Sequence, residues 1–201
     1  MVVGELLRRA SIKLKAEWQD GQDQRVEENF VEPDFMLPFD LERFEGDAYP
    51  AYDWGVSAVE LEFDALTGTN QVKGCWNSFD VGTPIDLNIV IGQMEGGVLQ
   101  GLGYASMEQM ASDEHGRIRN NSYSDYIIPT AMDIDELKVK MHIVEYPNGP
   151  YGAKGAGELP LVGIAPAFIS AAEQALDCKL NRIPLTAEQA LSLLQNREGV
   201  A

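Results

Sequence analysis

A glycine-rich segment that ends in a carboxylate is the part of the sequence best suited to chemistry. It spans Gly149–Glu158 and leads into an apolar run in which Pro160 suits the first turn of a helix. Glu158 then stands at a helix N-terminus, which favours its ionised form, whereas burial would favour the neutral form. A carboxylate under these opposing influences can act as a general base. The simpler alternative is a glutamate that only caps the helix.

A second glycine-rich segment, Gly92–Gly103, opens a predicted helix. Its glycines each lower helix propensity by up to about 1 kcal/mol, so another requirement must favour them. Close packing by a second backbone is one such requirement, and binding of an anion such as phosphate at the helix N-terminus is another. Gln93 offers both a hydrogen-bond donor and an acceptor to a polar cofactor. The alternative is a solvated glutamine on a tightly packed helix.

These segments need a scaffold, and the hydrophobic pattern predicts one of mixed strands and helices. Helical spacing predicts helices over 4–18, 91–110 and 161–176, and a near-capping box at Thr186–Gln189 predicts a last helix to about residue 195. Alternation predicts strands over 57–64, 71–80, 117–128 and 137–145, the first two joined as a hairpin. Because strands and helices do not alternate regularly, we expect the α+β class.

Charge and composition exclude several classes of protein. The 201 residues include 15 basic and 32 acidic ones, and a net charge of −17 argues against nucleic acid or an anionic membrane as a partner. The apolar stretch 159–172 is short and interrupted by Gly163 and Pro166, so we expect no membrane span. The sequence does not open with a charged and then apolar stretch, so we expect no secretory leader. Cys75 and Cys178 form no metal-ligand pattern, so we expect no metal ligands and a reducing, cytoplasmic location.

Residues 26–64 concentrate the acidic charge. They carry twelve carboxylates and one base, for a net charge of −11, together with many aromatic residues and prolines at 33, 38 and 50. The prolines predict an extended arm. The arm is either a solvated acidic loop or a segment that lies across another polypeptide. We therefore divide the chain into residues 1–48, an N-terminal helix and acidic aromatic arm, and residues 49–201.

Taken together, these features resemble the C-terminal part of the molybdopterin-binding subunit of the xanthine dehydrogenase and aldehyde oxidoreductase family of molybdenum hydroxylases. The two glycine-rich segments carry the most specific likeness, from Gly92 to Gly103 and from Gly152 to Glu158. Further matches are Val59–Gly68, Asp80–Gly82 and Tyr126–Pro129. The likeness runs from about residue 50 to about residue 195. Two other cofactor-contacting motifs of the family, a Gly-Gly-Phe-Gly type segment and a further glycine-rich loop, are missing from this sequence.

The resemblance implies a site and a reaction. Residues 49–201 would form part of a molybdopterin-binding domain, with Glu158 as the catalytic general base and Gln93 as a cofactor-binding residue. Lys154 is either a neighbour of the site or a solvent-facing residue. The implied cofactor is molybdenum–molybdopterin, with a cytosine dinucleotide form left open, and iron–sulfur clusters and FAD are expected on partner subunits.

The implied reaction is hydroxylation of an N-heterocycle, such as a purine or a pyridine carboxylate, or of an aldehyde, with water as the oxygen source. A partner chain or a missing N-terminal portion would supply the rest of the site. The alternative is a non-catalytic assembly subunit that only bridges partners in a multi-subunit oxidoreductase.

Overall fold

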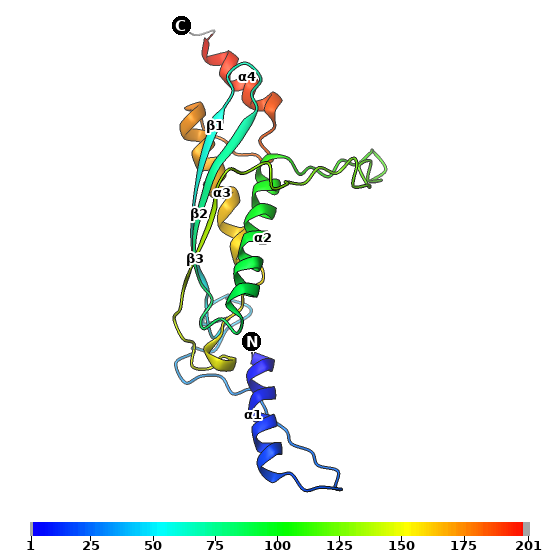
Figure 1. Cartoon of the computed structure of the whole chain (residues 1–201), viewed down its shortest axis with the longest axis vertical. Coiled ribbons are helices and arrows are strands. Elements are labelled where there is room, and N and C mark those ends of the chain that lie inside the picture. Colours follow the sequence, from blue (N-terminus) through cyan, green and yellow to red (C-terminus); the bar gives the residue numbers. More distant parts are fainter. Residues whose placement is uncertain (1, 199–201) are drawn as a thin grey trace. The chain divides into compact units, whose positions relative to one another are not determined.

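The computed structural model describes residues 2–198, which divide into two compact units (Figure 1). The sheet unit comprises residues 55–79, 88–141 and those from 156 onward. The arm unit comprises the residues up to Trp54 together with 80–87 and 142–155. The predicted division into residues 1–48 and 49–201 delimits the cofactor-binding portion, not a compact unit. It stays a prediction.

A mixed three-stranded sheet organises the sheet unit, in the order β1-β2-β3. The hairpin of β1 (Trp54–Phe63) and β2 (Asn70–Asp80) is closed by a 2.9 Å hydrogen bond from the Asp64 amide to the carbonyl of Thr69. A parallel bridge between Val72 and Ile134 leads into β3 (Leu137–His142). Helix α2 (Leu87–Ser106) lies in the connection between β2 and β3, as a parallel crossover requires. The α+β class is therefore confirmed.

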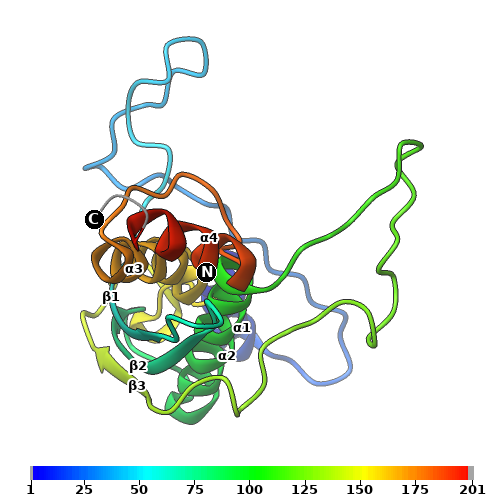
Figure 2. The same cartoon turned by 90° about the horizontal axis from the view of Figure 1, so that it is seen from above.

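Helices α2 and α3 (Leu159–Leu176) lie side by side on the sheet and enclose the core of this unit (Figures 1 and 2). Alternate residues of β2 point inward, and the helices contribute one apolar face each. A Cβ atom added at Gly101 of α2 would lie 2.8 Å from Cβ of Ile164 in α3. The glycines thus allow close helix packing. The largest buried side chains here are Phe79, Met94, Ile164, Phe168 and Leu176.

Gly96→Ala and Gly97→Ala should change stability in opposite directions. Gly97 is buried, and a Cβ atom there would lie 2.3 Å from Cγ of Pro160, so overpacking should cost about 1–3 kcal/mol. Gly96 is exposed with nothing within 4 Å of an added Cβ, so alanine should stabilise the chain by up to about 1 kcal/mol. Urea unfolding of both variants, followed by circular dichroism, measures the two changes. If both substitutions changed the free energy of unfolding in the same direction, the packing described for Gly96 and Gly97 would be contradicted.

The final helix, α4 (Ala187–Glu198), begins at the predicted capping box, which is confirmed. The amide of Gln189 donates to Oγ1 of Thr186 (3.4 Å), and the amide of Thr186 donates to Oε1 of Gln189 (3.3 Å). At the β1–β2 turn, Gly68 has φ of +72°, and a Cβ atom there would lie 2.3 Å from the carbonyl oxygen of Ala187. Only glycine therefore allows the turn to pack against α4.

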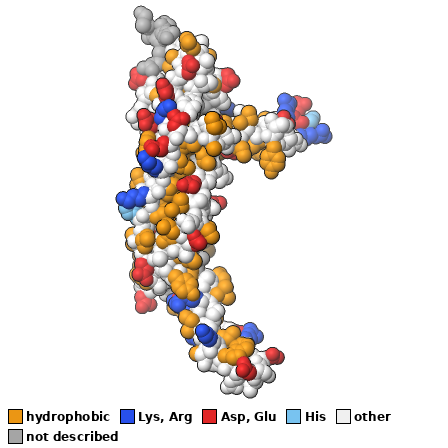
Figure 3. Space-filling view, viewed as in Figure 1, with side chains coloured by type: hydrophobic (Ala, Val, Ile, Leu, Met, Phe, Trp, Pro, Cys, Tyr) orange, Lys and Arg blue, Asp and Glu red, His pale blue; other side chains and the backbone are white. Residues whose placement is uncertain are grey.

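The predicted strand over 117–128 is wrong, because residues 107–136 form a loop that projects from the sheet unit (Figure 2). The side chain of Asn120 bonds the backbone of Ala111 and Gln109, and Asp113 accepts from two nearby amides. Such local bonds use backbone groups that a strand would offer to a neighbour. Hydrophobic side chains lie along this loop and charged ones gather at its tip (Figure 3). The other predicted helices and strands are confirmed, with ends shifted by up to four residues.

Helix α3 is, within residues 2–198, the one helix that is long and apolar enough to cross a membrane by length and composition. This is weak evidence, because the core helices of soluble proteins meet the same criteria. Ile164, Phe168 and Ala172 form a buried face of α3, as in a core helix.

The arm unit contains helix α1 (Val2–Glu17), which packs on the short 3₁₀ helix η1 (Pro150–Gly152). The buried Glu5 accepts hydrogen bonds from Arg8 (2.7 Å) and Arg9 (2.8 Å). The bond from Arg8 outweighs the effect of burial and lowers the pKa of Glu5 to about 2. The guanidinium of Arg8 also lies 5.6 Å from the ring centroid of Tyr151, which ties α1 to η1.

The arm predicted over residues 26–64 is extended up to residue 53, and its last part forms β1: residues 18–53, all of which the structure describes, contain no helix or strand. A small hairpin is held by a bridge between Asp40 and Glu45 and by a 2.8 Å hydrogen bond from the Leu37 amide to Asp47. The arm is thus locally folded, yet most of its large apolar side chains are exposed. These are Phe30, Val31, Phe35, Leu37, Phe39, Leu41, Phe44, Tyr49 and Tyr52.

Candidate functional site

The structure brings the two predicted site residues together in the sheet unit. Nε2 of Gln93 donates a 2.7 Å hydrogen bond to the carbonyl oxygen of Gly157, the residue before Glu158. Gln93 lies on α2, and Glu158 is the N-cap of α3. The packed pair of helices therefore positions both side chains, although 64 residues separate the two bonded partners along the chain.

Glu158 stands at the start of α3 with an unused carboxylate. Its backbone has φ of −112° and ψ of −3°, and its side chain makes no capping hydrogen bond. The residue is exposed, and no hydrogen bond or ion pair joins the carboxylate to the part of the chain that the structure describes. The capping alternative is therefore wrong, and so is the expectation that this chain itself buries the carboxylate. The role of Glu158 as a base stays a prediction.

The helix surface around Gln93 has room for another group. The predicted position of Gln93 at a helix start is wrong, because α2 begins six residues earlier, at Leu87. Gly92 and Gly96 flank Gln93, and a Cβ atom added at either would meet nothing within 4 Å. Oε1 of Gln93 has no hydrogen-bond partner among the described residues. An open helix backbone, a free amide oxygen and a free carboxylate together fit a polar cofactor that approaches the helix closely.

A ligand set for a metal ion is missing from the described part of the chain. Residues 2–198 contain no group of three or more His, Cys, Asp or Glu side chains that could hold a metal ion. At this site the described residues offer the side-chain amide of Gln93 and the carboxylate of Glu158.

A buried ion pair in the arm unit holds the glycine-rich segment Gly149–Glu158 through Lys154. Nζ of Lys154 lies 2.6 Å from Oδ2 of Asp80 and 3.1 Å from the carbonyl oxygen of Tyr52, and both charged side chains are 10% exposed. The solvent-facing alternative for Lys154 is therefore wrong. Burial acts to raise the pKa of Asp80, but the hydrogen bonds from Lys154 and from the Gly82 amide together lower it. Burial raises the pKa of the neighbouring Asp53.

Backbone hydrogen bonds reinforce this ion pair. The Lys154 amide donates to the carbonyl of Val81, and the Thr83 amide donates to that of Gly152, both at 2.8 Å. Gly82 has φ of +70°, and a Cβ atom there would lie 2.4 Å from the carbonyl oxygen of Gly152. Only glycine fits this position. Sequence reasoning missed Asp80 as the partner of Lys154, although both residues lie in the segments that carry the family likeness.

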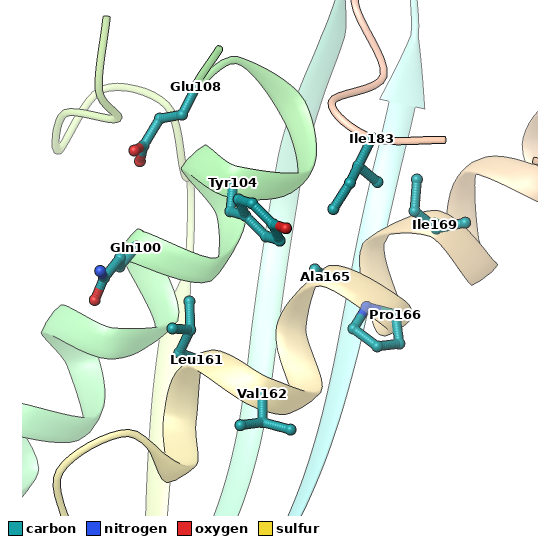
Figure 4. A pocket seen from close by; sticks show the side chains of 9 residues that line it. All are labelled: Gln100, Tyr104, Glu108, Leu161, Val162, Ala165, Pro166, Ile169 and Ile183. Carbon is teal, nitrogen blue, oxygen red and sulfur yellow. The ribbon is translucent and has the colours of Figure 1, made fainter. Parts of the chain in front are cut away.

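An apolar groove of about 560 Å³ lies between α2 and α3 (Figure 4). Most of its aliphatic side chains come from α3, and neither Gln93 nor Glu158 lines it. Exposed apolar surface of this extent is typical of interaction sites in proteins. The lining residues are Gln100, Tyr104, Glu108, Leu161, Val162, Ala165, Pro166, Ile169 and Ile183.

Comparisons with known proteins find similarity over much of the chain. A family described as molybdopterin cofactor-binding domain matches residues 5–135, a range that includes Gln93 and ends before Glu158. The chain is 33% identical to a probable xanthine dehydrogenase subunit of Bacillus subtilis over 150 residues, which is 74% of this chain and 20% of that protein. It is 35% identical to the nicotine 6-hydroxylase large subunit of Paenarthrobacter nicotinovorans over 147 residues, 71% of this chain and 18% of that protein.

The fold is similar to a solved structure of the aldehyde oxidoreductase from Desulfovibrio gigas. The TM-score is 0.69 at 28% sequence identity, and the match covers 80% of this chain and 17% of that one. The chain therefore spans about a fifth or less of the length of these relatives.

Proposed function

The chain belongs to the molybdopterin cofactor-binding domain family, and we propose that it supplies part of the active site of a molybdenum hydroxylase. The observation that carries this proposal is the free carboxylate of Glu158 at a helix start, next to a backbone carbonyl held by Gln93. Because the chain spans a fifth or less of its relatives, we propose that a partner chain or a further portion of the same polypeptide completes the site.

In this proposal Glu158 acts as the general base and Gln93 binds the cofactor. When bound, the molybdenum–molybdopterin group supplies the redox chemistry and the Lewis acidity that makes water easier to deprotonate. Glu158 accepts that proton on its carboxylate, which no other group of this chain occupies. Gln93 offers Oε1 to hydrogen-bond donors of the cofactor, and Gly92 and Gly96 leave room beside it.

The proposed substrate is an N-heterocycle, such as a purine or a pyridine carboxylate, or an aldehyde. The named activities of the relatives, which include xanthine dehydrogenase, nicotine 6-hydroxylase and aldehyde oxidoreductase, support this range. We propose iron–sulfur and flavin subunits as further partners and leave the nucleotide form of the pterin open. The unpaired Cys75 and Cys178 support a reducing, cytoplasmic location.

Two surfaces support the proposal of a partner polypeptide. The arm keeps a row of apolar side chains exposed on a locally folded hairpin. The groove between α2 and α3 leaves one apolar face of the sheet unit open. Surfaces of this kind are normally covered in an assembled protein.

The molybdenum content of the intact complex tests the proposed function. We expect elemental analysis of the complex, purified with its neighbouring chains, to give molybdenum in a fixed ratio to this chain. A stable complex that contains this chain but no molybdenum would favour the alternative of a bridging subunit without catalytic function.

A further inference from the structure

We propose that Gln93 is also a positioning residue, which holds Glu158 in place through the carbonyl group of Gly157. This inference deepens the proposed function and rests on it. It assigns the two ends of one amide to different tasks: Nε2 holds the chain's own loop, and Oε1 is left for the cofactor.

The geometry fixes which end of the amide faces the loop. The carbonyl oxygen of Gly157 can only accept a hydrogen bond, so the group 2.7 Å away must be the N–H₂ end of the Gln93 side chain. Oε1 then points away from this bond and has no partner among the described residues. The loop therefore orients the amide as an acceptor for an N–H or O–H group of a ligand.

Gly157 has little else to hold it. A Cβ atom added at Gly157 would meet nothing within 4 Å, so packing does not restrain the residue. In the part of the chain that the structure describes, the bond from Gln93 is the one hydrogen bond to residues 155–157. Glycine has the largest backbone freedom, and Gly155 and Gly157 both lie in this stretch. Loss of the Gln93 bond should therefore release the peptide group that carries Glu158.

Packing of α2 holds the backbone at Gln93 in place. The next residue, Met94, is fully buried, and Gly97 one turn later packs against Pro160 in the first turn of α3. The donor on Gln93 and the acceptor on Gly157 are thus held in place by two packed helices. The Gln93 side chain is long enough to join them. A residue that acts through Glu158 in this way should affect kcat more than KM.

The pair Gln93→Glu and Gln93→Met separates the two tasks. Glutamate keeps an acceptor oxygen at the same chain length but loses the N–H₂ donor, whereas methionine loses both. We expect both variants to release the loop and to lower kcat by about tenfold to a hundredfold. Only Gln93→Met should also lose cofactor from the purified complex. The control is Gln174→Glu, an exposed residue near the end of α3, where the side chain makes no hydrogen bond to the described residues and no change is expected.

Backbone relaxation measured by NMR on the full chain gives a readout that does not depend on activity. Order parameters at Gly157 and Glu158 should fall from about 0.85 towards 0.6 or below in both Gln93 variants, but not in Gln174→Glu. Unchanged order parameters would overturn the positioning role, even if Glu158→Gln inactivates the enzyme. Increased mobility with full turnover would show that the Gln93 bond restrains the loop but does not serve catalysis, which also overturns the positioning role, whereas Glu158→Gln tests the general base separately.

Discussion

Glu158→Gln should lower kcat of the assembled enzyme by about 10²–10⁴-fold while its molybdenum content stays unchanged. Glutamine has the same size as glutamate but cannot take up a proton. The carboxylate makes no capping bond and no ion pair with the described residues, so its replacement removes no contact within this chain. Steady-state kinetics and elemental analysis of the same preparation measure both quantities.

Glu95→Gln is a matched control for this substitution. Glu95 is an exposed carboxylate on α2, two residues from Gln93, and two residues turn it to a different side of the helix. We expect its turnover and metal content to equal those of the wild type. Near-normal turnover in Glu158→Gln would refute the general base. A loss of molybdenum in that variant would show that Glu158 retains the cofactor.

The fold was predictable where hydrophobic spacing and local chemistry agreed. Helices α2 and α3 follow from the helical spacing of apolar residues. The hairpin of β1 and β2 follows from alternating apolar residues and the turn residues between the two strands. The capping box at Thr186 follows from the side-chain types alone. The segment 117–128 shows the limit of this reasoning. Its alternating apolar residues match a strand, but whether a neighbouring strand is present cannot be read from a local pattern.

The candidate site was predictable in its residues and less so in their surroundings. Glycine density marked both segments, and close packing requires some of these glycines: Gly97 and Gly149 would each clash with a neighbour if they carried a Cβ atom. The spacing of residues along the sequence does not show which groups far apart in the chain form pairs. The bond from Gln93 to Gly157 and the ion pair of Lys154 with Asp80 join residues 64 and 74 positions apart. Such contacts depend on the packing of the helices and strands in three dimensions.

Breaking the ion pair between Lys154 and Asp80 should have the largest effect on stability. Lys154→Met should destabilise the chain by about 3–5 kcal/mol, the range for removing one partner of a buried pair. Asp80 would keep its charge at a position that is 10% exposed, and the nearby carboxylate of Asp53 would add repulsion. Equilibrium unfolding in urea at neutral pH measures this change.

The pH dependence of this effect has a definite sign. The folded structure lowers the pKa of Asp80 below its ordinary value of 3.8, so the stability from the pair is present above that pH and is lost as pH falls through the folded value. In Lys154→Met the effect of burial on Asp80 is no longer opposed by the lysine, so its pKa should rise and protonation should relieve the buried charge. The difference in stability between wild type and variant should therefore begin to narrow above pH 3.8, as Asp80 of the variant is protonated, and should narrow further as the pH falls through the lowered pKa of the wild type.

Two further variants test whether burial of the Lys154–Asp80 pair causes the expected loss of stability in Lys154→Met. Lys138 and Glu136 form an ion pair of similar length, 2.7 Å, but their side chains are 64% and 43% exposed, so Lys138→Met should change stability by only about 0–1 kcal/mol. Adding Asp80→Asn to Lys154→Met removes the unpaired charge and keeps an acceptor for the Gly82 amide, so it should restore much of the loss. If Lys154→Met behaved like Lys138→Met, the ion pair would not be what anchors the segment that leads to Glu158.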